Sequence, residues 1–142
     1  MCLWSHVMGL FCRMSALESP KILILGGTAE AAAIAQAIVS RWGEDVQVTA
    51  SLAGRTLAPP AFPGAVRVGG FGGVNAMADY LRDERIAVVI DATHPFAAQI
   101  SENAQAACVS ASVPRLLFDR PPWEQGDEDR WHMVESATQA AT

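Results

Sequence analysis

KILILGGTAEA, residues 21–31, joins two different patterns of side chains. Lys21–Leu25 is a short apolar run without polar alternation, which is typical of a strand buried on both faces of a sheet. The tripeptide Gly-Gly-Thr at 26–28 interrupts the run, and an alanine-rich stretch follows from Ala29 to Trp42. Gly43 then supplies a common helix stop. The stretch predicts a buried strand, a tight turn and a long helix.

The same succession of strand, turn and helix is repeated along the chain. Apolar and β-branched runs predict further strands at Val46–Ser51, Val66–Val68, Ala87–Ala92 and Arg115–Phe118, with Trp131–Val134 as one more candidate. Continuous apolar strands that alternate with helices are typical of an open parallel sheet with helices on both faces. Right-handed crossovers place the strand-to-helix loops on one edge of such a sheet, where ligands bind. We therefore predict a Rossmann-like α/β fold.

Spacing adds two expectations about the helices. In the first helix, Ile34, Ala37 and Ile38 are spaced so that all three can face the sheet. After the fourth strand, His94 precedes Pro95, and the residue before a proline is disfavoured in helical geometry. We therefore expect His94 to cap the next helix and Pro95 to be its first residue.

Composition excludes several classes of protein. The 142 residues are 51% hydrophobic and 18% charged, unlike a disordered chain. A net charge of −5 without a basic cluster argues against nucleic-acid binding. No apolar run approaches the roughly 20 residues that span a bilayer, so no membrane association is expected. The three cysteines form neither a disulfide framework nor a zinc spacing, which favours a cytoplasmic protein without a bound metal.

The scarcity of lysine excludes further kinds of binding and catalytic site. Lys21 is the only lysine, and no Gly-Lys pair exists that could form a Walker-type phosphate loop. Tyr80 is the only tyrosine, and Glu84 lies four residues on, where short-chain dehydrogenases carry a lysine. A phosphate-bearing ligand would therefore have to be bound by glycine turns, helix N-termini and arginines.

The two ends of the chain differ from its middle. Residues 1–20 lack a defensible periodicity and lack the pattern of a signal peptide, so we expect a non-functional leader, with an ordered arm over a sheet edge as the alternative. Residues 136–142 resemble the opening of a helix without a stop signal. We expect residues 21–135 to form the domain and 136–142 to be the start of a truncated helix.

Four predicted strand ends carry the candidate site. After the first strand, Gly26 and Gly27 allow close backbone approach, and Thr28 can cap the following helix or donate to a phosphate held at the helix N-terminus. The alternative is a tight turn with an ordinary cap. After the second strand, no Asp or Glu is present to bind a ribose 2′-hydroxyl. Ser51, Arg55 and Thr56 instead suit a 2′-phosphate, which favours NADP, although a solvated arginine remains the alternative.

The other two strand ends have equally unusual residues. Four glycines surround Phe71, and we expect a cofactor across the strand ends to require that backbone freedom, with a flexible connection as the alternative. In the fourth loop, His94 lies where a bound nicotinamide would react. Its imidazole could bind a substrate carboxylate or relay a proton, and a capping role is the alternative. Asp91 more often braces such a loop than acts as a base.

The motifs in their order resemble the precorrin-6A reductase family of cobalamin biosynthesis, including its cobalt-precorrin counterpart. The matching segments are ILILGGTAEA (22–31), SLAGRT (51–56), RVGGFGG (67–73), IDATHPFAAQIS (90–101) and RPPW (120–123). The resemblance implies NADPH-dependent reduction of the tetrapyrrole precorrin-6A to precorrin-6B. It also implies a second α/β domain that would follow this one, with the substrate in the cleft between them.

The resemblance suggests a role for each strand end. It implies that Gly26, Gly27 and Thr28 hold the pyrophosphate and that Ser51, Arg55 and Thr56 hold the 2′-phosphate end. Gly70, Phe71 and Gly72 would lie near the nicotinamide ribose, and Thr93, His94 and Pro95 by the nicotinamide and substrate, with His94 the candidate catalytic residue. Two alternatives stay open: a non-catalytic NADP-binding fragment, or a reductase for another substrate on the same fold.

Overall fold

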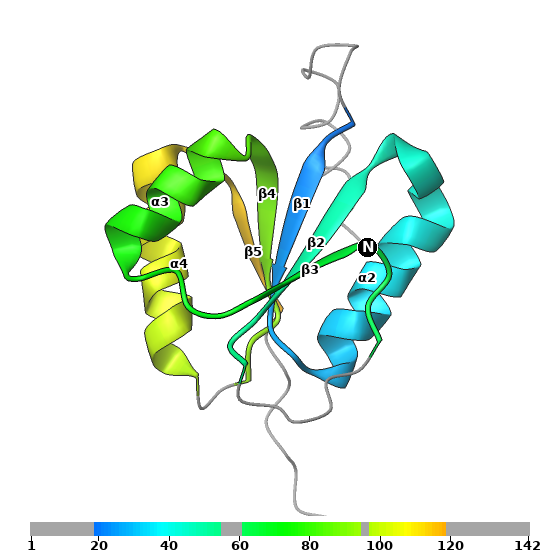
Figure 1. The fold of residues 1–142 in the computed structure, drawn as a ribbon, viewed down its shortest axis with the longest axis horizontal. Coiled ribbons are helices and arrows are strands. Elements are labelled where there is room, and N and C mark those ends of the chain that lie inside the picture. Colours follow the sequence, from blue (N-terminus) through cyan, green and yellow to red (C-terminus); the bar gives the residue numbers. More distant parts are fainter. Residues whose placement is uncertain (1–18, 55–60, 95–96, 119–142) are drawn as a thin grey trace, which may run out of the picture.

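The structure is a computed structural model, and it describes residues 19–54, 61–94 and 97–118 (Figure 1). The strands are β1 (Lys21–Leu25), β2 (Gln47–Leu52), β3 (Ala65–Val68), β4 (Ile86–Asp91) and β5 (Arg115–Leu117). The α-helices are α2 (Ala29–Trp42), α3 (Val74–Asp83) and α4 (Ala98–Ala111), and a short 3-10 turn, η1 (Gly43–Asp45), follows α2. All strands pair in parallel, in the order β3-β2-β1-β4-β5. The predicted open parallel sheet is confirmed.

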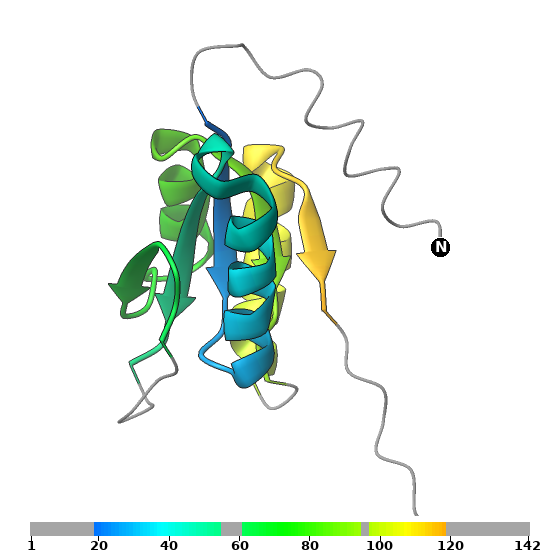
Figure 2. The same cartoon turned by 90° about the vertical axis from the view of Figure 1, so that its right-hand side faces the viewer.

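Helices cover both faces of this sheet, as predicted. Helix α2 lies on one face, and α3 and α4 pack together on the other (Figures 1 and 2). Successive residues of β1 point to opposite faces, so Ile22 and Ile24 pack under α2 while Leu23 and Leu25 pack under α3 and α4. This is why the strand is apolar at every position after Lys21.

The buried face of α2 differs in part from the expectation. Ala31, Ala35 and Ile38 are buried, Ile34 is half-buried, and Ala37 is exposed. The spacing argument was wrong for Ala37 because the stripe that faces the sheet follows the residues at i, i+4 and i+7 from Ala31. Small alanines on that stripe let the helix pack closely on the strands.

The start of the last helix also differs from the expectation. Helix α4 begins at Ala98, with Ala97 as its cap, so the predicted capping role of His94 is wrong. The His94 carbonyl instead accepts a hydrogen bond from the Ala97 N–H (2.7 Å). Proline restricts the residue before it, but this rule does not fix how many residues separate the proline from the helix. Pro95 itself lies outside the described residues.

Several other expectations fall outside the described part of the chain. Residues 1–18 of the expected leader, the candidate strand Trp131–Val134 and the expected helix start at 136–142 lie there. Within the described ranges, no helix is both long enough and apolar enough to cross a membrane.

Candidate functional site

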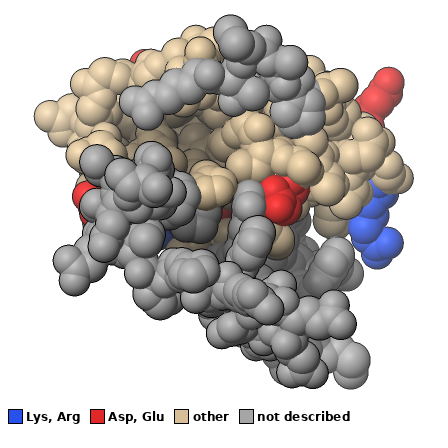
Figure 3. Space-filling model, turned by 90° about the horizontal axis from the view of Figure 1, so that it is seen from below, with Lys and Arg blue, Asp and Glu red and all other residues tan. Residues whose placement is uncertain are grey.

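The candidate site lies on the edge of the sheet where the parallel strands end, here called the carboxyl edge. Figure 3 views the molecule from this side, and most of the described surface there is formed by residues other than Lys, Arg, Asp and Glu. After β1 the chain enters α2 on one face, and after β4 it leads to α4 on the other. Loops that diverge in this way leave a crevice at neighbouring strand ends, which is where open α/β sheets bind ligands.

Gly26 brings the β1 loop against the β4 loop at this edge. Its backbone φ is +126°, and a Cβ added there would lie 2.5 Å from the Ala92 carbonyl oxygen. The Gly26 N–H also donates to the Ser51 carbonyl oxygen (3.1 Å). A side chain at this position would separate the β1 loop from the β4 loop, so glycine is required by the contact as well as by the backbone conformation.

Thr28 fixes the start of α2. Its Oγ1 accepts a hydrogen bond from the Ala31 N–H (3.2 Å) and donates to the Ala92 carbonyl oxygen (3.3 Å). The hydroxyl thus caps the helix and ties it to the β4 loop. Because both of these bonds engage Thr28, the groups best placed to bind an anion here are other backbone N–H groups of the first turn, aided by the helix dipole.

The end of β2 is organised by an arginine that the sequence analysis did not single out. Arg67 on β3 is the register partner of Ser51, and its Nη1 donates to Ser51 Oγ (3.0 Å). Its guanidinium also donates to the carbonyl oxygens of Gly69 (2.9 Å) and Gly70 (3.1 Å). The only sequence signal for this role is an arginine in an apolar strand, directly before a glycine-rich loop.

The glycine-rich loop after β3 is held by aromatic contacts. The Arg67 guanidinium lies 3.8 Å from the centroid of the Phe71 ring, and Phe71 meets Tyr80 of α3 edge-on at 5.2 Å. Phe71 is half-buried and packs against the core on the α3 and α4 face of the sheet. We call Arg67, Ser51, Phe71 and Tyr80 the Arg67 cluster. Gly70 and Gly72 flank Phe71 on the β3 side of the sheet, with β2 and β1 between them and β4.

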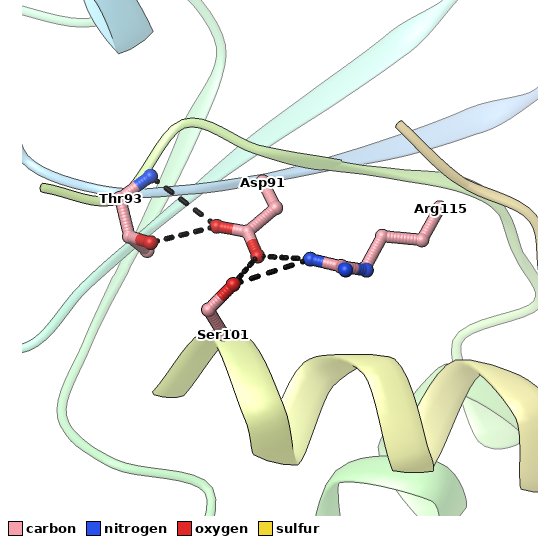
Figure 4. A network of polar contacts seen from close by, with 4 residues as sticks. All are labelled: Asp91, Thr93, Ser101 and Arg115. Carbon is pink, nitrogen blue, oxygen red and sulfur yellow. Dashed lines mark hydrogen bonds and ion pairs between the residues drawn. The ribbon is translucent and has the colours of Figure 1, made fainter. Parts of the chain in front are cut away.

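A second polar cluster lies at the end of β4 (Figure 4). The Asp91 side chain is fully buried and accepts hydrogen bonds from Thr93 Oγ1 (2.8 Å) and Ser101 Oγ (2.6 Å). Arg115 of β5 donates to the same carboxylate at 2.5 Å. We call these four residues the Asp91 network. It braces the loop, the role expected for Asp91, and joins β4, α4 and β5.

The remaining expected residues lie around the Asp91 network or outside the described chain. Thr93 is half-buried, and His94 is exposed at the carboxyl edge. Arg55, Thr56 and Pro95 lie outside the described residues, so the structure does not place them. Cys108 of α4 is buried, and burial raises the pKa of its thiol.

Known proteins with similar sequences match most of this chain. A precorrin-6A reductase from Sinorhizobium sp is 46% identical over 130 residues, which cover 90% of this chain and 48% of the relative. One from Rhodobacter capsulatus is 49% identical, covering 80% of this chain and 44% of that protein. A cobalt-precorrin-6A reductase from Salmonella typhimurium is 33% identical over 70% of this chain.

A solved structure agrees with the sequence comparisons. The structure titled CobK precorrin-6A reductase matches with a TM-score of 0.77 and 46% identity, over 85% of this chain and 47% of that one. The chain thus spans about half the length of the relatives it matches. The family model described as precorrin-6x reductase CbiJ/CobK matches residues 21–142. With the motifs, the fold and these matches in agreement, the chain belongs to the precorrin-6x reductase CbiJ/CobK family.

Proposed function

We propose that this chain is the NADPH-binding part of a reductase that converts precorrin-6A, or cobalt-precorrin-6A, to precorrin-6B in cobalamin biosynthesis. Family membership supports the reaction and the tetrapyrrole substrate. The observation that carries the cofactor proposal is the close contact between Gly26 and Ala92 beside the N-terminus of α2. It builds a glycine turn and a helix start at the place where open parallel sheets bind dinucleotides.

The residues at the carboxyl edge fit a phosphorylated dinucleotide. Gly26, Gly27 and the first turn of α2, capped by Thr28, would hold the pyrophosphate. Ser51 with Arg55 and Thr56 would hold the 2′-phosphate, and the described end of β2 and its loop, 51–54, contains no carboxylate that would bind a ribose hydroxyl instead. When bound, NADPH supplies the hydride for the reduction.

Strand order changes one expected assignment. Gly70, Phe71 and Gly72 follow β3, which lies beyond β2 at the edge of the sheet, whereas the nicotinamide is expected near β4. A dinucleotide whose pyrophosphate lies at α2 would reach β3 with its adenosine end. We therefore propose that these three residues contact the adenosine, in place of the nicotinamide ribose that the sequence suggested.

The β4 loop is the proposed place of reaction. The Asp91 network holds Thr93 through both its hydroxyl and its backbone N–H, so the loop that carries His94 is fixed at its start. Thr93, His94 and Pro95 would line the nicotinamide and the substrate. His94 is exposed at this edge, where its imidazole could pass a proton to the reduced tetrapyrrole. We further propose a cytoplasmic protein that does not bind nucleic acid or membranes.

The second candidate is an NADP-binding chain without reductase activity of its own. The 142 residues span about half the length of the relatives that they match, and this part carries the proposed cofactor site. The expected second domain would supply the other side of the substrate cleft.

Two measurements with the purified 142-residue chain test the proposal. Titration calorimetry is expected to show that NADPH binds more tightly than NADH, and absence of NADPH binding would refute the cofactor assignment. Oxidation of NADPH in the presence of precorrin-6A, followed by absorbance, then separates the two candidates. Turnover supports the reductase, whereas NADPH binding without turnover supports the non-catalytic chain.

A further inference from the structure

Arg67 is a charged side chain without a carboxylate partner in the described part of the chain. The ion pairs described there join Lys21 to Glu84, Arg82 to Asp79 and Arg115 to Asp91. Within the described ranges Arg67 instead donates to neutral oxygens, those of Ser51, Gly69 and Gly70. Its positive charge is thus positioned by these three hydrogen bonds and by the rings of Phe71 and Tyr80, and is not neutralised by them.

The bond between Arg67 and Ser51 also determines what Ser51 can bind. A guanidinium has only donors, so Ser51 Oγ must accept in this bond. The hydroxyl hydrogen of Ser51 is then left to donate to another group. Only 7% of Ser51 is exposed, so few groups can reach it. A phosphate oxygen that reaches the end of β2 would accept this hydrogen, with the Arg67 charge behind it.

The position of Ser51 connects this donor to the proposed pyrophosphate site. The Ser51 carbonyl oxygen accepts the Gly26 N–H, so Ser51 lies directly beside the β1 turn. Arg67 lies on the far side of Ser51 from that turn, because β3 pairs with the outer edge of β2. This is the side on which the adenosine end of a dinucleotide is proposed to lie.

We propose that Arg67 is a specificity-determining residue that acts through Ser51. It holds the Ser51 hydroxyl as a donor and supplies positive charge behind it, so the carboxyl edge prefers a dinucleotide with a phosphate on the adenosine ribose. The inference rests on the proposed binding of NADPH, and it adds a selectivity residue on β3 to those proposed at the end of β2.

Titration calorimetry of the 142-residue chain with NADPH and with NADH tests the role of Arg67. The substitution Arg67→Met keeps an apolar side chain over Phe71 but removes the charge and the bond to Ser51. We expect NADPH affinity to fall about tenfold or more, the usual effect of losing a charge-assisted hydrogen bond. NADH affinity should fall by less than about threefold, because it has no 2′-phosphate. A purely structural role would lower both affinities alike.

Further variants keep the test independent of any effect on folding. Ser51→Ala leaves Arg67 in place and should reduce NADPH affinity in the same selective way. In the double variant, Arg67→Met with Ser51→Ala, the loss of NADPH binding free energy should be smaller than the sum of the losses in the two single variants. Both substitutions break the same pair of residues, so their effects should not add. Arg82→Met, on the exposed face of α3, serves as the matched control and should change neither affinity.

The outcomes separate this inference from the proposed function. Equal losses for NADPH and NADH in Arg67→Met and Ser51→Ala would overturn the role of Arg67 and leave NADPH binding standing. Failure of the unsubstituted chain to bind either nucleotide would overturn the cofactor proposal, and this inference with it. Where Arg67→Met does not fold, Arg67→Gln takes its place, and a selective loss of NADPH affinity in that variant supports the inference.

Discussion

Two arginines lie on the two edge strands of the sheet, Arg67 on β3 and Arg115 on β5, and they contact different partners. Arg115 contacts the buried carboxylate of Asp91, and only 16% of its side chain is exposed. Arg67 meets no carboxylate among the described residues and is stacked on Phe71 beside neutral oxygens. A neutralised arginine holds the protein together, whereas an arginine with fixed geometry and no carboxylate partner among the described residues is suited to an anionic ligand.

The Arg67 cluster and the Asp91 network both include residues from one row that runs across neighbouring strands of the sheet. The strand register aligns Arg67, Ser51, Leu25 and Asp91 side by side, and neighbours in register point to the same face. This is the face covered by α3 and α4, which supply Tyr80 and Ser101 to the two clusters. Leu25 separates the clusters, so each can be changed without direct contact with the other.

The largest expected effect is a difference in stability between the proteins in which one or the other arginine is replaced. Arg115→Met leaves the Asp91 carboxylate buried without its counter-charge, which should lower the free energy of unfolding by about 3 kcal/mol or more. Arg67→Met leaves carbonyl oxygens that water can reach and should cost about 1 kcal/mol. Urea denaturation measures both. Equal losses would mean that Arg67 is as structural as Arg115, against its proposed role in binding.

The next effect compares the stability cost of substituting a glycine near each cluster, Gly26 beside the β4 loop and Gly70 beside Arg67. Gly26→Ala places a Cβ against the Ala92 carbonyl at a backbone conformation that strains other residues, and should lower the free energy of unfolding by about 2–3 kcal/mol. A Cβ on Gly70 would meet nothing within 4 Å. Gly70→Ala should therefore change the free energy of unfolding by less than about 0.5 kcal/mol. Urea denaturation again decides, and a tolerated Gly26→Ala would refute the close packing of the β1 and β4 loops.

The sequence predicted the strands and the turns better than it predicted the partners of polar side chains. The bounds of β1 and α2 agree fully with the expected ones, because an apolar run, two glycines and a capping threonine are all local signals. The pairing of Arg67 with Ser51 depends on the register between strands joined by a long loop, which no local pattern specifies. The contact of Arg115 with Asp91 spans 24 residues and depends on strand order in the same way.

The smallest expected effect tests the surroundings of Arg67 through Tyr80. Burial and then the Glu84 carboxylate raise the pKa of the Tyr80 phenol above its ordinary value of 10.0, while the Arg67 guanidinium opposes them. The folded protein therefore binds the phenolic proton more tightly than the unfolded chain. By linkage, stability falls as the pH rises above the unfolded pKa of 10.0.

Comparison with a phenylalanine variant isolates this contribution. Tyr80→Phe should differ from the unsubstituted chain by less than about 0.5 kcal/mol at pH 7. Above pH 10 the unsubstituted chain should lose stability relative to the variant, as measured by urea denaturation at both pH values. Adding Arg67→Met to each chain should enlarge that loss, since the charge that favours the phenolate is gone. An unchanged or smaller loss would mean that the Arg67 charge is already neutralised by another group, and the contrast with Arg115 would no longer hold.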